Sequence, residues 1–146
     1  MSTLKVDTYL TRGGASEIAI DKLKGVTAAG SMLVVGEGGT TTTNLQQGLC
    51  KSWIDVNQGS AGTGQTINDS FNVTSVTDTA AGQTTVTIAN DMASANYCAT
   101  SGSNQVTTAY NHGVFSTGVY RMDALNGSNA DTDSDYVGTA IHGDLA

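Results

Sequence analysis

The chain has 146 residues, a net charge of −7 and only 13% charged residues, which is enough for one domain with an extension. The acidic balance argues against a general nucleic-acid binder, which needs a basic face for phosphates. No apolar run approaches the roughly 20 residues of a membrane span, and residues 1–30 lack the apolar core of a secretory signal. We therefore expect a chain that folds in a cytosol without nucleic acid or membrane as a partner.

The composition favours strands. Thr and Val, which favour strands, are abundant, and Gly, Asn, Asp and Ser, which favour turns, are frequent. Leu, Ile, Val and Phe together make up only about 19% of the residues, so the core is expected to be thin. A thin core without disulfides or metals is commonly supplemented by oligomerisation. The sequence therefore predicts an ordered, oligomeric β protein.

The first third of the chain carries weak signals. Leu4–Leu10 and Glu17–Ile20 predict short strands, Asp21–Lys24 predicts one helical turn, and Ser31–Gly36 predicts an apolar strand. The polar stretch Thr40–Gln47 is typical of a linker. We expect residues 1–47 to form a short N-terminal β extension.

From Leu49 onward, alternating apolar residues recur at short intervals between turn residues, a pattern of all-β sandwiches and barrels. This pattern predicts residues 48–146 as an antiparallel β-sandwich domain of jelly-roll-like kind. The expected strands are Leu49–Val56, Phe71–Thr77, Thr84–Ala89, Asn96–Thr100, Val114–Met122 and Tyr136–His142. The expected loops are Gln58–Gly64, Thr79–Gln83 and Asn126–Asp135.

Several segments of the chain form an ordered set of motifs. They are LKVDT at Leu4–Thr8 followed by Ile18–Ile20, LCKSWIDV at Leu49–Val56, INDSFNVTSVTD at Ile67–Asp78, GQTTVTI at Gly82–Ile88, and MASANY at Met92–Tyr97. In this order they resemble a β domain found in tail-fibre and other virion proteins of marine bacteriophages, especially those that infect cyanobacteria. Val56 and Thr84 depart from the aromatic residues usual in that family. The departures fall at packing positions, and the order of segments is more specific than any one of them.

The resemblance implies a non-enzymatic structural protein of a phage particle, folded in the host bacterial cytoplasm and located in the virion. A tail-fibre or appendage component that contributes to attachment or host adsorption is the first hypothesis, with residues 1–47 serving virion attachment or oligomerisation. A capsid decoration (cement) protein that stabilises the head is the alternative, and a glycan-binding module is the outsider. The expected partners are two further copies in a homotrimer, tail or major capsid proteins, and a host surface glycan.

Three aspartates with an alternating spacing, Asp131, Asp133 and Asp135, are weak candidates for a cation site. Alternating carboxylates can supply oxygen ligands to Ca²⁺, but the Gly and the later Glu of an EF-hand loop are missing, so a solvated loop is favoured. His112 and His142 lack the spacing of zinc ligands. The sequence therefore predicts neither a metal nor another cofactor.

No catalytic motif stands out. The sequence has no Gly-x-Ser-x-Gly elbow, and its glycine-rich stretches Gly36–Gly39 and Gly59–Gly64 lack the lysine of a phosphate-binding loop. Cys50 and Cys98 are expected to stay reduced and buried, as cysteines of cytosolic proteins generally do. We therefore predict no catalytic residues and no enzymatic activity, and the receptor-binding residues are unknown at this point.

Trp53 is expected to fill the core, packed with residues such as Phe71, Val86 and Ile141, so that truncation to Ala costs about 3–5 kcal/mol. The alternatives for Trp53 are a subunit contact or a platform for sugar stacking. Four tyrosines could likewise line a glycan site, although packing in the core or at an interface is favoured; they are Tyr97, Tyr110, Tyr120 and Tyr136. The residues predicted for core or assembly are Trp53, Phe71, Val86, Ile88, Tyr97, Val119 and Ile141.

Overall fold

The structure is a computed structural model that describes residues 32–36, 39–59, 64–105, 107–110 and 114–145, with 107–110 described by their backbone alone. Within these ranges the chain is mostly β, all strand pairs are antiparallel, and one four-residue α-helix is present. The predicted all-β class is therefore confirmed. The elements predicted between residues 4 and 24 lie outside the described residues.

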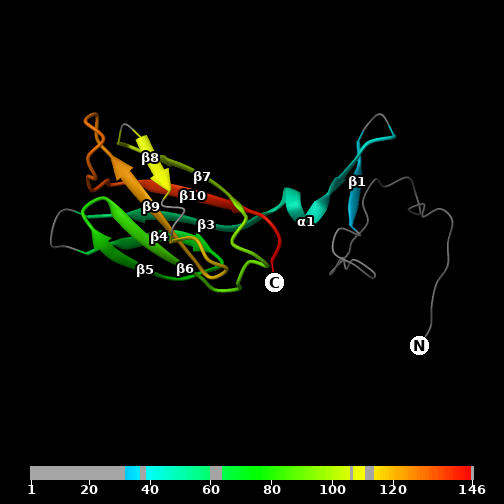
Figure 1. The fold of residues 1–146 in the computed structure, drawn as a ribbon, viewed down its shortest axis with the longest axis horizontal. Helices are drawn as coiled ribbons and strands as arrows, with labels where there is room; N and C mark the ends of the chain where they lie inside the picture. The colour runs from blue at the N-terminus through cyan, green and yellow to red at the C-terminus, as the bar shows by residue number, and fades with distance from the viewer. Residues whose placement is uncertain (1–31, 37–38, 60–63, 106, 111–113, 146) are drawn as a thin grey trace, which may run out of the picture.

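Eight strands form two four-stranded sheets (Figure 1). The first sheet has the order β4 (Thr66–Phe71), β3 (Cys50–Asn57), β10 (Val137–His142) and β7 (Cys98–Ser103). The second has the order β5 (Val73–Ala80), β6 (Gln83–Ile88), β9 (Val119–Leu125) and β8 (Thr107–Tyr110). The chain passes from one sheet to the other four times, between β4 and β5, β6 and β7, β7 and β8, and β9 and β10. Strands distant in sequence thereby become neighbours.

The hydrophobic core takes side chains from both sheets. Burial alternates strictly along the central strands β6, β9 and β10, because successive side chains of a strand point to opposite faces. The buried apolar residues are Ile54, Val56, Val86, Ile88, Met92, Tyr120, Met122, Ala124, Val137 and Ile141. Three of the predicted core residues, Val86, Ile88 and Ile141, are therefore confirmed as core.

One predicted strand is in fact two. Asn72 has φ of +58°, in the left-handed region that Asn tolerates better than most residues, and it separates β4 from β5. Its side-chain Nδ2 donates to the carbonyl of Lys51 (2.9 Å), and its Oδ1 accepts from the backbone N–H of Asn90 (2.7 Å). These bonds hold the chain where it crosses from the first sheet to the second. The segment Phe71–Thr77 therefore contributes to both sheets, with Phe71 in β4 and the residues after Asn72 in β5.

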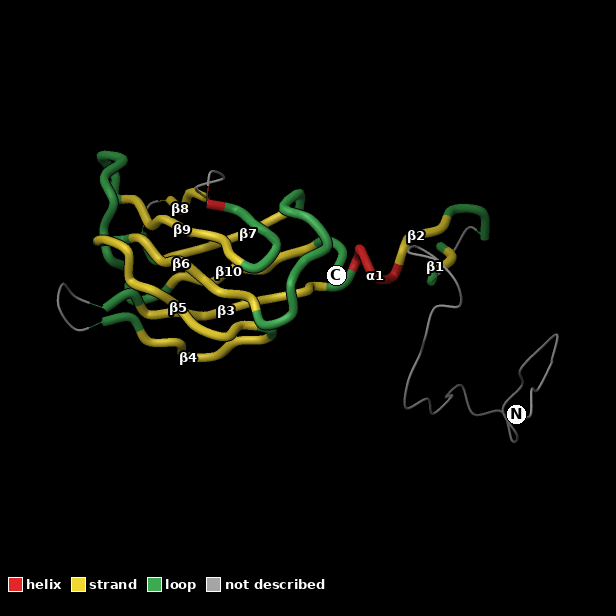
Figure 2. Tube along the Cα trace, turned by 60° about the horizontal axis from the view of Figure 1, so that its bottom comes forward, coloured by secondary structure: helices red, strands yellow, loops and turns green. Residues whose placement is uncertain are grey.

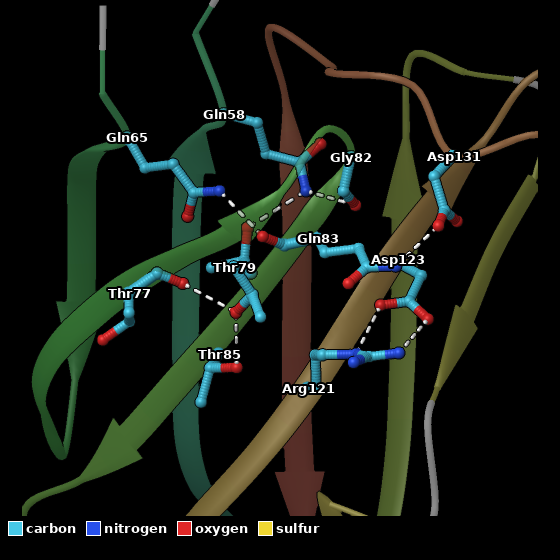
Figure 3. A network of polar contacts seen from close by, with 11 residues as sticks. Gln58, Gln65, Thr77, Thr79, Gly82, Gln83, Thr85, Arg121, Asp123 and Asp131 are labelled. Carbon is cyan, nitrogen blue, oxygen red and sulfur yellow. Dashed lines mark hydrogen bonds and ion pairs between the residues drawn. The ribbon is translucent and has the colours of Figure 1, made fainter. Parts of the chain in front are cut away.

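At one end of the sheets, side-chain amides and carboxylates make a polar network (Figure 3). Gln58, which follows β3 and is only 2% exposed, donates from Nε2 to the carbonyl of Gly82 (2.9 Å) and to Oγ1 of Thr84 (3.0 Å). Its Oε1 accepts from the backbone N–H of Ser134 (3.1 Å). One buried amide thus joins the end of β3 to the turn before β6 and to the loop before β10.

Tyr97 packs beside this core next to Phe115, with ring centroids 5.1 Å apart. Its hydroxyl donates toward the carbonyls of Ser116 (3.1 Å) and Val119 (3.0 Å). Burial raises the pKa of Tyr97 from 10.0 to about 12, because desolvation disfavours the phenolate. Tyr97 is half-buried and packs against the core cluster, whereas Val119 is half-buried and is not among the described residues that pack against it.

The raised pKa of Tyr97 predicts a loss of stability in alkali. Between pH 10 and about pH 12 the unfolded chain releases the Tyr97 proton while the folded chain retains it, so the stability contributed below pH 10 is lost as the pH rises. Denaturant midpoints measured across this range should fall less steeply in Tyr97→Phe than in the wild type. An identical slope in both proteins would contradict the assignment.

The described part of the N-terminal region is a small hairpin. β1 (Leu33–Val35) pairs with β2 (Thr42–Asn44), and helix α1 (Leu45–Gly48) follows, capped by the Asn44 side chain. The polar stretch expected as a linker therefore contains a strand and a helical turn. Figures 1 and 2 place the hairpin beyond α1, away from the two sheets, and none of its residues belongs to the core cluster.

Candidate functional site

The outer face of the first sheet, the side turned away from the core, carries an aromatic row. Strand register places Phe71, Trp53, Ala140 and Thr100 side by side across β4, β3, β10 and β7. Their neighbours along the strands, such as Ile54 and Ile141, are buried in the core, so this row faces outward. Phe71 is 53% exposed and Trp53 is half-buried.

A second row lies two residues further along the strands. Asp69, Asp55, Gly138 and Gly102 are register partners across the same four strands. Because the β10 and β7 members of this row have no side chains, the face is hollowed here. The resulting trough has a volume of about 440 Å³ and is lined by Trp53, Ile54, Asp55, Thr100, Ser101, Gly102, Tyr136, Gly138, Thr139 and Ala140.

Tyr136 closes the far end of the trough. It is 48% exposed, and its ring lies against Gly138, where an added Cβ would be 2.6 Å from the Tyr136 hydroxyl oxygen. Gly138 therefore makes room for this ring. Gly102 is different, because an added Cβ there meets nothing within 4 Å. The floor is thus open over β7, with Trp53 along one side and Tyr136 at the end.

The prediction that Trp53 lies in the core is wrong. Trp53 is absent from the buried cluster and shares its face with the exposed Phe71, because Ile54 and Val56 take the inward positions of β3. Phe71 is likewise outside the core. Both side chains lie instead on the outer face of the first sheet, and of the two it is Trp53 that lines the trough.

Truncation of Trp53 is therefore expected to cost less than a core aromatic. We expect Trp53→Ala to lower the free energy of unfolding by about 1–2 kcal/mol, because only part of the ring leaves contact with the protein. Tyr120→Ala, which removes a fully buried ring, should cost about 3–5 kcal/mol. Urea denaturation followed by circular dichroism compares the two variants. Equal losses of unfolding free energy would show that Trp53 packs as a core residue.

The charged side of the trough is strongly acidic. Asp55 lies directly opposite Asp69, an arrangement of like charges that destabilises a sheet, and Asn68 at the adjacent bulge donates to Asp55 Oδ1 (3.3 Å). From residue 48 onward the chain has nine Asp against one Lys and one Arg, a net charge of −7. Lys51 donates to the carbonyl of Gln46, and Arg121 pairs with Asp123 at 2.9 Å.

The three candidate cation ligands lie elsewhere, before β10. Asp133 Oδ1 accepts from the backbone N–H of Gly82 (2.6 Å), and Asp131 Oδ2 accepts from Gln83 Nε2 (2.6 Å), whereas Asp135 is exposed. Two of the three carboxylates therefore fasten this loop to the turn before β6. Among the described residues, no group of three or more His, Cys, Asp or Glu side chains is placed to hold a metal ion.

The cysteines flank a histidine. His142 is the register partner of Cys50 on β3 and of Cys98 on β7, a proximity that sequence spacing did not indicate. Both thiols are free, and Cys98 is exposed, so the prediction that both are buried is wrong. A whole strand separates the two cysteines, about 9–10 Å between Cα atoms at the usual strand spacing, which is too far for a disulfide. His112 lies outside the described residues.

The tyrosines separate into distinct roles. Tyr120 is fully buried, and its hydroxyl shares a hydrogen bond of 2.8 Å with Thr139 Oγ1, so it is excluded as a surface platform. Tyr97 packs against the core, and the side chain of Tyr110 is outside the described part of the chain. Tyr136 lines the trough.

Comparison with protein-family models, curated proteins and solved structures finds no match to this chain. No helix in the described ranges is long and apolar enough to cross a membrane. The function therefore has to be inferred from the residues and their arrangement.

Proposed function

We propose that the chain is a structural protein of a bacteriophage particle, a tail-fibre or appendage component that folds as a β-sandwich and assembles as a homotrimer. The ordered resemblance of Leu49–Tyr97 to virion β domains supports this proposal. The observation that carries it is the division of the chain into a small apolar hairpin at one end and a β domain with its own core at the other (Figure 2). In this role the hairpin region attaches, and the β domain points outward.

The sandwich is supported by the shared core. Inward residues of both sheets belong to one buried cluster, for example Ile54 and Ile141 from the first sheet and Val86 and Met122 from the second. Eight strands in two four-stranded sheets also match the strand count of a jelly roll. In three places, two strands that are consecutive in sequence are also neighbours in the same sheet: β3–β4 in the first sheet, and β5–β6 and β8–β9 in the second. The domain therefore resembles a jelly roll in its two layers and its number of strands.

The hairpin supports assembly. Leu33, Val34 and Val35 are 54%, 50% and 58% exposed, so both faces of β1 present apolar side chains. An isolated two-stranded hairpin is marginally stable in water, and an exposed apolar strand edge readily pairs with another chain. Burial of each such side chain contributes up to about 3 kcal/mol. Equivalent hairpins of neighbouring subunits would supply that burial.

The oligomer is testable through β1. The wild type should have the mass of a trimer at micromolar concentration, and the double variant Leu33→Ser, Val35→Ser should shift to the monomer mass because it removes the apolar contact. Thr43→Ser, a change at an exposed polar position opposite Val34, is the matched control and should stay trimeric. Light scattering coupled to size exclusion gives the masses. A wild-type monomer would contradict the proposal.

Location in the particle tests the proposal as a whole. Antibody labelling of intact phage particles, combined with quantitative mass spectrometry of the purified virion, should place the chain at the tail in tens of copies or fewer. Hundreds of copies on the head would replace the appendage role with capsid decoration. Absence from purified particles would overturn the virion role altogether.

A further inference from the structure

The trough on the outer face of the first sheet has the make-up of a ligand site. Its volume of about 440 Å³ falls within the range of small-molecule sites, roughly 300–1,000 Å³. The open part of its floor is the bare backbone of Gly102, which lets a flat ring approach closely, whereas the Tyr136 ring covers Gly138. Its sides are the half-buried indole of Trp53 and the phenol of Tyr136, and its polar groups include the Asp55 carboxylate and the Thr100 hydroxyl.

These groups fit a sugar ring. The electron-rich faces of Trp and Tyr attract partially positive edges, and the C–H groups on one face of a pyranose are such a surface. A carboxylate accepts hydrogen bonds from vicinal hydroxyls, and Asp55 has acceptor capacity beyond its single bond of 3.3 Å to Asn68. Asp55 lies opposite Asp69 beside the aromatic trough, and a role in ligand binding would account for this unfavourable pair.

Charge and geometry exclude other occupants. The β domain carries a net charge of −7, and no Lys or Arg lines the trough, so phosphates and anionic sugars would be repelled. A peptide that adds a strand pairs with the backbone at a sheet edge, whereas this trough lies on the face of the sheet, over β3, β10 and β7. The occupant that fits the trough is therefore a neutral ligand that stacks on the aromatic rings and forms hydrogen bonds through hydroxyl groups.

We infer that this trough binds a neutral glycan, with one pyranose ring stacked against Trp53 beside the open backbone of Gly102. The inference rests on the proposed role as an outward-facing virion component and specifies what that component recognises. It is tested on the purified full-length chain, so its outcome is independent of whether the chain is found at the tail, on the head or in no particle.

The test uses the fluorescence of Trp53, which is the only tryptophan of the chain and therefore reports on the trough directly. Neutral oligosaccharides of glucose, galactose and mannose are titrated into the protein up to millimolar concentrations, with sialyllactose as the anionic comparison. At least one neutral oligosaccharide should change the Trp53 emission saturably. Sialyllactose should bind at least about tenfold more weakly.

Gly102→Val is the decisive variant. The added side chain fills the floor over β7, its Cβ meets nothing within 4 Å, and Val favours strands, so the fold is kept while the trough is blocked. Glycan affinity should fall by about tenfold or more. Phe71→Ser is the matched control, because Phe71 is exposed on the same face but does not line the trough, and its affinity should equal that of the wild type.

Each result decides the inference. Saturable binding that Gly102→Val abolishes and Phe71→Ser retains establishes the site. Binding that survives in Gly102→Val places the sugar elsewhere and overturns it, as does the absence of any response to neutral oligosaccharides. If instead Gly102→Val lowers the mass of the oligomer, measured by light scattering, the trough is a contact between copies of the chain and the glycan assignment is wrong.

Discussion

Gly82→Ala should be the most damaging single-atom addition to the β domain. Gly82 occupies the two-residue connection between β5 and β6 with φ of +69°, where an L side chain is strained. An added Cβ would lie 2.4 Å from the backbone N of Thr132 and 2.7 Å from the carbonyl oxygen of Ala124. Because these are backbone atoms held by their own hydrogen bonds, neither can move aside cheaply. We expect a loss of about 3–5 kcal/mol.

Gly64→Ala separates the two causes of that loss. Gly64 has φ of +74°, but an added Cβ there meets nothing within 4 Å, so this variant has the backbone strain without the collision. It should cost only about 1 kcal/mol. Urea denaturation followed by Trp53 emission measures both variants. Similar losses would mean that positive φ alone, and not the approach of the Ala124 and Thr132 backbones, makes Gly82 irreplaceable.

Local strand signals predicted most of the β domain because alternation and turn residues are local properties. The run expected at Tyr136–His142 is β10, and the turn expected at Thr79–Gln83 contains Gly82. The break at Asn72 is not visible in the sequence pattern, because a single left-handed residue inside an apolar alternating run changes which sheet the chain joins. Only the bonds of Asn72 to Lys51 and Asn90 reveal that crossing.

The orientation of Trp53 was predictable but was misjudged. Strand alternation divides β3 into two faces, and Trp53 shares its face with Asp55 and Asn57, whereas Ile54 and Val56 form the other. Two polar residues on the same face as one large aromatic residue indicate an outward face. The expectation of a buried Trp53 follows from side-chain size alone, which is a weaker indication than the alternation along β3. The rest of the trough was not predictable, because Gly102 and Gly138 come together only through the pairing of β7 with β10.

Gln58 illustrates the same limit for the interior. By sequence it begins a Gly/Ser-rich loop, and such loops are usually solvated, yet its side chain is 2% exposed and joins three segments. Figure 3 shows its bond to Gly82 in the turn before β6. Gln65, at the other end of the same loop, is half-buried and donates from Nε2 to the carbonyl of Gln83 (3.0 Å). Its Oε1 is buried without a hydrogen-bond partner in the described part of the chain. At the two ends of this loop, the amide of Gln58 therefore uses both its oxygen and its nitrogen in hydrogen bonds, whereas the amide of Gln65 uses only its nitrogen.

Gln58→Leu is therefore expected to lower the free energy of unfolding by about 2–5 kcal/mol. Leu has a similar size but leaves the N–H of Ser134 and the hydroxyl of Thr84, both buried, without the bonds that Gln58 supplies, and each unsatisfied group costs about 1–3 kcal/mol. Gln65→Leu should stay within about 1 kcal/mol of the wild type, because it loses one bond but also removes the unpaired Oε1. Denaturant titration of both variants gives the comparison, and a larger loss in Gln65→Leu would show that packing, and not the amide network, holds this end of the sheets together.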